Sequence, residues 1–150
     1  MRRRLLHTDG YVWAVGLSLL GVAWPAWGWP VLTGWLAVAV VTWVRDGRSD
    51  ASVPALVTVC LLRQLPGIAA ALACFLPDAQ GWQEWAAGAL SVWVHPLMPV
   101  LEALPAGTWE GLSGTFWAAA AAPLVVGWVS AAVTLASRRW ERRAARSVNG

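Results

Sequence analysis

Residues 11–44 read YVWAVGLSLLGVAWPAWGWPVLTGWLAVAVVTWV and contain no charged side chain. A single helix of this length would be about 51 Å long, whereas the hydrocarbon core of a bilayer is about 30 Å thick. The stretch must therefore fold back, and 24–30 (WPAWGWP) is the place, because two prolines and a glycine interrupt a helix there. Its three tryptophans suit a membrane–water boundary. The sequence thus predicts a helical hairpin with arms at about 11–24 and 31–44.

The composition of the whole chain is that of a membrane protein. Of the 150 residues, 58% are hydrophobic and 13% are charged, whereas soluble domains carry about 25% charge. This excludes a soluble enzyme domain and a disordered tail. Cys60 and Cys74 would lie about 21 Å apart on one helix, which also excludes a disulfide between them. All eleven basic residues are Arg and Trp is abundant, at thirteen, which indicates a GC-rich bacterial genome.

Two further spans are expected, at 52–76 and 112–137. Ser52 followed by Pro54 is typical of a helix start, with proline in the first turn. The loop at 45–50, RDGRSD, is expected to be aqueous. The last span is rich in Ala and Gly, and a basic tail at 138–150 follows it.

The segment 82–104 is hydrophobic enough to cross, but it holds Glu84, His95, Glu102, two prolines and three tryptophans. If it does not cross, ten Arg residues share one side of the membrane, while 78–111 lies opposite and holds none. The positive-inside rule favours this arrangement. We therefore predict an all-α, polytopic helical membrane protein forming one integral domain. It has four transmembrane helices, an interfacial or re-entrant 82–104 segment bent at Pro96–Pro99, and both termini cytoplasmic, in the bacterial inner membrane.

Arg63 is the most informative residue, because it lies near the middle of an apolar segment, where charge is costly. Such a residue is a functional candidate by default, together with its neighbour Gln64. Its expected partner is Glu102, a lipid or another chain, since the other confident spans hold no acidic residue. The alternative is structural: Gln64, Pro66 and Gly67 mark a helix break at which Arg63 snorkels or binds freed carbonyls.

His95 and Glu102 are the other intramembrane candidates. They are seven residues apart, about two helical turns, so one helix face would present both to a proton relay. Pro96 and Pro99 lie between them and disturb that helix, which favours a structural role for His95.

Two groups in the last segment are candidates for contacts with other molecules. Small residues at close spacing favour tight helix packing, within the chain or across subunits; these are Gly114, Ala118, Ala122, Gly127 and Ala131. Arginines in the tail suit anionic lipid headgroups or a cytosolic partner, or serve only as a topological anchor; these are Arg138, Arg139, Arg142, Arg143 and Arg146.

Motifs for nucleotide binding, zinc hydrolysis and serine nucleophiles are missing from the sequence. We therefore expect no catalytic residue, no metal and no cofactor. No nucleic-acid partner is expected either, because the Arg clusters flank spans instead of covering a folded face. The first hypothesis is a non-catalytic membrane subunit or assembly factor that contacts the bilayer, its anionic lipids, and other membrane chains or further copies of itself. The alternatives are a small oligomeric transporter or channel with Arg63 in the ion path, and a lipid-modifying enzyme using His95 or Glu102.

Overall fold

The computed structural model describes residues 9–77, 81–105 and 107–148. It is mostly helical, which confirms the predicted all-α class. The helices are α1 (Asp9–Ala23), α2 (Gly28–Gly47), α3 (Val53–Leu62), α4 (Leu65–Ala73), α5 (Trp82–Val94), α6 (Met98–Leu101) and α7 (Gly114–Val148). Two 3-10 turns, η1 (Pro25–Trp27) and η2 (His95–Leu97), and a hairpin of β1 (Thr108–Trp109) with β2 (Leu112–Ser113) complete it.

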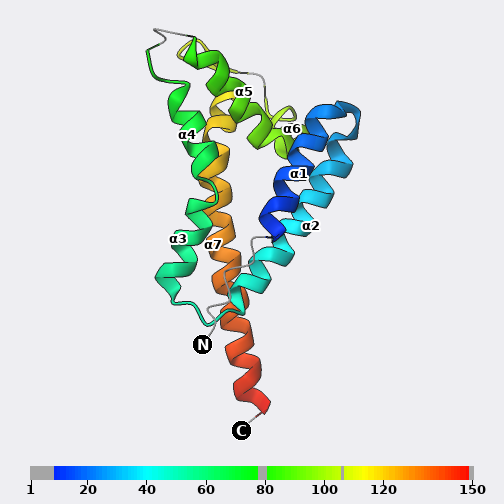
Figure 1. The fold of residues 1–150 in the computed structure, drawn as a ribbon, viewed down its shortest axis with the longest axis vertical. Coiled ribbons are helices and arrows are strands. Elements are labelled where there is room, and N and C mark those ends of the chain that lie inside the picture. Colours follow the sequence, from blue (N-terminus) through cyan, green and yellow to red (C-terminus); the bar gives the residue numbers. More distant parts are fainter. Residues whose placement is uncertain (1–8, 78–80, 106, 149–150) are drawn as a thin grey trace.

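The helices α1, α2, α7 and the α3–α4 pair run along the long axis of the molecule (Figure 1). The α1–α2 hairpin and the α3–α4 pair both pack against α7, which therefore forms the spine of the fold. At the end away from the basic tail, α5 leaves the α4 side and runs obliquely to the hairpin, which it meets with η2 and α6 (Figure 1). The last part of α7 projects beyond the other helices.

The α1–α2 hairpin turns where the sequence predicted it. Pro25 opens η1 and α2 begins at Gly28, so the break coincides with the Pro- and Gly-containing stretch. Gly28 also lets the α5–α6 region approach, because a Cβ there would lie 3.0 Å from Pro99 Cγ. The break at η1 and the close approach of Pro99 to Gly28 therefore place the hairpin turn against η2 and α6.

The third predicted span, at 52–76, corresponds to α3 and α4, which together form one bent limb. Ser52 caps α3, since its hydroxyl accepts a hydrogen bond from Ala55 N, and Pro54 lies in the first turn, as the sequence predicted. The limb breaks between Leu62 and Leu65, and α3 and α4 meet at an angle of 47°. The predicted interruption at Arg63 and Gln64 is therefore confirmed.

The α7 helix is longer than the predicted last span and absorbs the basic tail up to Val148. The hairpin in front of it was not predicted. Glu110 and Gly111 form its two-residue turn, both with positive φ (51° and 78°), which is the conformation that joins tightly twisted antiparallel strands. Pro123 lies inside α7 without ending it, as is tolerated where neighbouring helices surround the freed carbonyl.

Among the described residues, one helix is long and apolar enough to cross a membrane by itself, Gly114–Ala144. The α3–α4 pair meets the same criterion only when its two bent parts are counted together, and Gly10–Ala23 is a shorter apolar helix. The α1 helix, at 15 residues, is about 22 Å long.

One prediction about local environment is wrong. The expected aqueous loop at 45–50 begins later, because α2 continues through Gly47 and Asp46 is only 1% exposed. Trp93 also differs from the other two tryptophans of its segment, because Trp82 and Trp85 are exposed and Trp93 is not. Trp93 turns inward and hydrogen-bonds Gln64. In both cases a polar partner on a distant segment holds the residue inside.

The core is small and the exterior is apolar. Ala71, Leu90, Val94, Leu101 and Ala122 form the main buried cluster, where α4, α5, α6 and α7 meet. Far more large apolar side chains are exposed than buried, along α1, α2, α4 and α7. The outward face of α7 alone exposes Leu124, Val125, Trp128 and Val129.

Candidate functional site

An ion pair inside the helical body is the principal polar feature of the fold. Arg63, at the break between α3 and α4, donates through Nη1 to Oδ2 of Asp46 near the end of α2. The side chain of Asp46 is 1% exposed and that of Arg63 is 15% exposed. The break between α3 and α4 positions this ion pair. Arg63 is the residue at which α3 ends, and its long side chain extends from there to Asp46 on α2.

Close packing of α2 on α7 seals the carboxylate. Gly47 lies against Thr134 and Ser137, and a Cβ there would collide with both. Thr134 is fully buried and its hydroxyl lies 3.8 Å from the Cys60 sulfur of α3. Three helices therefore converge beside Asp46 and exclude water from it.

One oxygen of this carboxylate is left unsatisfied. Asp46 Oδ1 is buried and has no hydrogen-bond partner within the described part of the chain. A buried ion pair of this kind is not a strong source of net stability, since both charges have been removed from water. Removing one partner is the costly change, because the other charge then remains in an apolar interior.

The helix break is held by an indole. Trp93 of α5 donates from Nε1 to Oε1 of Gln64 at 3.1 Å. Its ring lies over Gly67, where a Cβ would collide with the indole and would approach Pro123 Cγ of α7 at 2.9 Å. Glycine is thus needed at 67 for close approach, and α4, α5 and α7 meet there.

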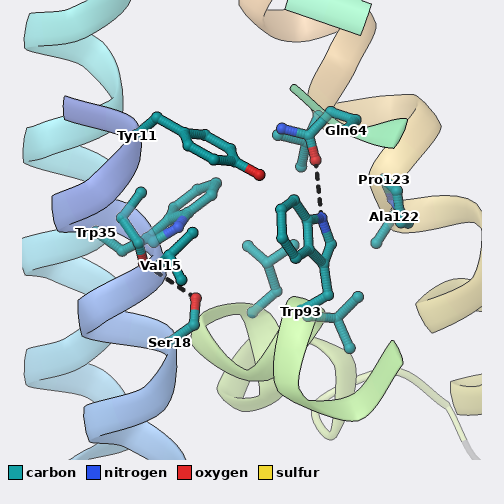
Figure 2. Close-up of a pocket in the computed structure, with 12 residues that line it drawn as sticks. Tyr11, Val15, Ser18, Trp35, Gln64, Trp93, Ala122 and Pro123 are labelled. Atoms are coloured by element: carbon teal, nitrogen blue, oxygen red, sulfur yellow. Dashed lines mark hydrogen bonds between the residues drawn. The ribbon is translucent and has the colours of Figure 1, made fainter. Parts of the chain in front are cut away.

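A partly open cleft lies between the α1–α2 hairpin on one side and Gln64, α5, η2 and α7 on the other (Figure 2). It consists of two adjoining pockets, which share Tyr11, Ala14, Trp35, Gln64 and Val126 as lining residues. The larger pocket extends to Ser18, Trp93 and Pro123, and the smaller one extends to Thr42 and Arg63. The cleft therefore runs along the hairpin from the ion pair toward η2.

His95 and Glu102 are placed apart from Arg63. His95 is half-buried in η2 and packs on α1, because a Cβ at Gly21 would collide with its ring. Glu102 is exposed at the end of α6. Of the expected partners of Arg63, which were Glu102, a lipid or another chain, Glu102 is not the one observed, because Arg63 pairs with Asp46. His95 lies in η2 and Glu102 follows α6, so they do not share one helix face.

The small residues of α7 lie largely inside the fold. Ala122, Gly127 and Ala131 are buried, and a Cβ at Gly127 would lie 3.1 Å from Leu61 Cδ2. Ala118 packs against the main core cluster, and Gly114 approaches the carbonyl of Gly107. This row therefore serves close packing of α7 within the chain.

The basic end of α7 is partly used within the chain. Arg138 donates to the carbonyl of Ala51 at 2.5 Å, and Arg48 pairs with Glu141 at 2.5 Å. These contacts attach the α2–α3 connection to α7. The side chains of Arg139, Arg142 and Arg143 are exposed, whereas Arg2–Arg4, Asp78 and the side chain of Arg146 lie outside the described residues.

Sequence reasoning missed Asp46, Trp93 and the cleft residues Tyr11 and Trp35. One available signal pointed to Asp46. A helix of about 20 residues is needed to cross a 30 Å core, and an arm ending at residue 44 was shorter than that. Extending the arm to the required length carries Asp46 inside. No comparable local signal distinguished Trp93 from the exposed Trp82 and Trp85.

Among the described residues, no group of three or more His, Cys, Asp or Glu side chains lies close enough to hold a metal ion. Comparison of the chain with family models, curated proteins and solved structures gave no match.

Proposed function

We propose that this chain is a non-catalytic integral membrane subunit, or an assembly factor, that binds another membrane protein in the bacterial inner membrane. In the proposed topology, α1, α2, the α3–α4 limb and α7 each cross the bilayer. The α5–α6 segment and the β hairpin lie at the outer surface, and both termini are cytoplasmic.

The apolar exterior is the observation that carries the proposal. Large aliphatic and indole side chains cover the outside of the helices, whereas the main interior charges, Arg63 and Asp46, pair with each other. Water would penalise such a surface at about 25 cal/mol per Å² of apolar area, and lipid would not. The short length of α1 is accommodated by local thinning of the bilayer.

The distribution of charge and tryptophan supports the orientation. Arg45, Arg48 and the described tail arginines gather at one end of the molecule, where α2 ends and α7 projects (Figure 1). The opposite end carries the exposed indoles in and beside η1, at the start of α5 and in β1 (Figure 1), which are Trp24, Trp27, Trp29, Trp82, Trp85 and Trp109. Indoles suit the interface and Arg suits the cytoplasmic side.

The outward face of α7 is the surface we assign to the partner. Leu124, Val125, Trp128 and Val129 form an exposed stripe, and the same helix continues into the projecting basic segment (Figure 1). One helix thus offers an apolar contact within the bilayer and exposed arginines beyond it.

Photo-crosslinking in native membranes tests the subunit proposal. A photoreactive residue at Val125 or Val129 is expected to capture one protein species in stoichiometric amount, and mild detergent is expected to co-purify it. A photoreactive residue at Val12, exposed on α1, is the matched control and is expected to capture lipid. A well-behaved monomer in mild detergent, with no crosslink from α7, would refute the proposal.

A second function, a proton or ion path past Arg63, is favoured by the unsatisfied Oδ1 of Asp46. A buried carboxylate in a membrane is a common proton carrier, and Arg63 lines the smaller pocket of the cleft. Flux in liposomes tests this function. The Asp46→Asn/Arg63→Gln double variant keeps the site uncharged and is expected to abolish flux if the path exists. Unchanged flux in a folded double variant would eliminate it.

A further inference from the structure

We infer that the cleft beside α1 is a binding site for a flat, uncharged ring carrying a carbonyl oxygen, the chemistry of a quinone. This inference does not depend on the partner chain proposed above. The larger pocket is lined by residues of α1, α2, α5, η2 and α7 and by Gln64 at the break between α3 and α4.

The walls of the cleft suit a flat ring. Tyr11, Trp35 and Trp93 come from α1, α2 and α5 and face the same space (Figure 2). The Tyr11 and Trp93 rings have centroids 6.0 Å apart and are tilted by 50°, so each leaves ring surface open to the cleft. Aromatic groups pair favourably in offset or tilted arrangements. The remaining lining is apolar, with Val94, Leu97 and Pro123 toward η2 and α7.

Two hydrogen-bond donors are directed into this space. The indole of Trp93 donates to Oε1 of Gln64, which fixes the orientation of the amide and turns its NH₂ group toward Tyr11 (Figure 2). The Tyr11 hydroxyl points into the same space from α1 (Figure 2). A carbonyl oxygen placed between them would accept from both groups.

The charge of the lining favours a neutral ligand. No charged side chain lines the larger pocket. Arg63, at the end of the smaller pocket, is paired with Asp46. Burying a charged ligand there would cost free energy without a compensating partner. Ser18 donates its own hydroxyl proton to the Ala14 carbonyl at 3.1 Å, so its contribution to a ligand is limited to accepting.

Titration calorimetry on the purified full chain in detergent tests the site, with protein-free micelles subtracted. The probe is a decyl-substituted benzoquinone. The comparison ligands are decylbenzene, which has a ring but no carbonyl, and methyl palmitate, which has a carbonyl but no ring. Saturable binding of one benzoquinone per chain is expected. Tyr11→Phe, which keeps the ring and removes one donor, is expected to weaken binding about three- to tenfold.

Ala14→Leu fills the cleft from a residue that lines both pockets and is expected to weaken binding more than tenfold. Ala37→Leu, on the exposed side of α2, is the matched control and is expected to bind like the wild type, as is Trp13→Phe on the exposed side of α1. Equal binding of decylbenzene, or stronger binding of the methyl ester, would overturn the assignment to a ring carbonyl. Unchanged binding in folded Tyr11→Phe and Ala14→Leu would overturn the site.

Discussion

A single ionic contact shows how one charge is accommodated inside an apolar fold. Arg63 and Asp46 are 17 residues apart and belong to different helices, yet each neutralises the other where water is excluded. Because both charges have lost their hydration, the ion pair adds little net free energy of stabilisation. Its structural effect is to join α2 to the helix break between α3 and α4.

Arg63→Ala is expected to destabilise the chain by about 3–5 kcal/mol, because Asp46 is then left charged and unpaired in the interior. The Asp46→Asn/Arg63→Gln double variant is expected to recover most of that loss. Unfolding in a denaturing detergent series, monitored by circular dichroism, measures both variants. Equal stability of Arg63→Ala and the wild type would show that the pair is not sealed from water.

Two adjacent arginines in α7 provide a second comparison at the residue scale. Arg138 donates to the Ala51 carbonyl, whereas Arg139 is exposed. Arg138→Met is expected to cost about 1.5–3 kcal/mol, the usual range for a hydrogen bond to a charged group. Arg139→Met is expected to change the unfolding free energy by less than about 0.5 kcal/mol. Equal losses in the two variants, measured by the same unfolding series, would contradict the contact with Ala51.

At the level of the helices, the break in the α3–α4 limb is stabilised from outside it. Gln64, Pro66 and Gly67 interrupt the helix locally, but the indole of Trp93 fills the space that the interruption opens. The α3–α4 limb, α5 and α7 therefore meet at Gly67. A substitution there is expected to disturb the packing of both α5 and α7.

Gly67→Ala is expected to lower the unfolding free energy by about 1–3 kcal/mol, because the new methyl group collides with Trp93 and crowds Pro123. The matched control is Gly88→Ala on α5, where a Cβ meets open space. Alanine is the better helix former by about 1 kcal/mol, so this variant is expected to be as stable as the wild type or more so. A loss in Gly88→Ala equal to that in Gly67→Ala would show that the indole contact is not the cause.

For the whole molecule, the sequence predicted the features with local causes. Proline and glycine stopped the helices at 24–30 and at 63–67, and Ser52 with Pro54 started α3, as observed. The burial of Asp46 and Trp93 was not predictable in that way. Each depends on a partner in a separate segment, Arg63 and Gln64. Only the length that a crossing helix needs pointed to the burial of Asp46, and no local pattern distinguished Trp93 from exposed tryptophans.

The number of membrane crossings is a property of the whole chain, and labelling of single cysteines tests it. The background replaces Cys60 and Cys74 with alanine, and cysteine is placed singly at the exposed positions Asp50, Glu84, Thr108 and Ser147. With four crossings, 50 and 147 share the cytoplasmic side, and 84 and 108 share the outer side. An impermeant maleimide added to intact cells is then expected to label 84 and 108 only, and to label 50 and 147 after permeabilisation.

A fifth crossing by 82–104 gives a different pattern, in which 84 and 147 are labelled from outside while 50 and 108 are protected. The structure provides a reason to expect the first pattern. The chain from α5 to the four-residue α6 is interrupted by η2, so 82–104 does not form one continuous helix. It also lies obliquely across one end of the molecule (Figure 1). Labelling of 108 from the cytoplasmic side alone would therefore overturn both the charge argument and this geometry.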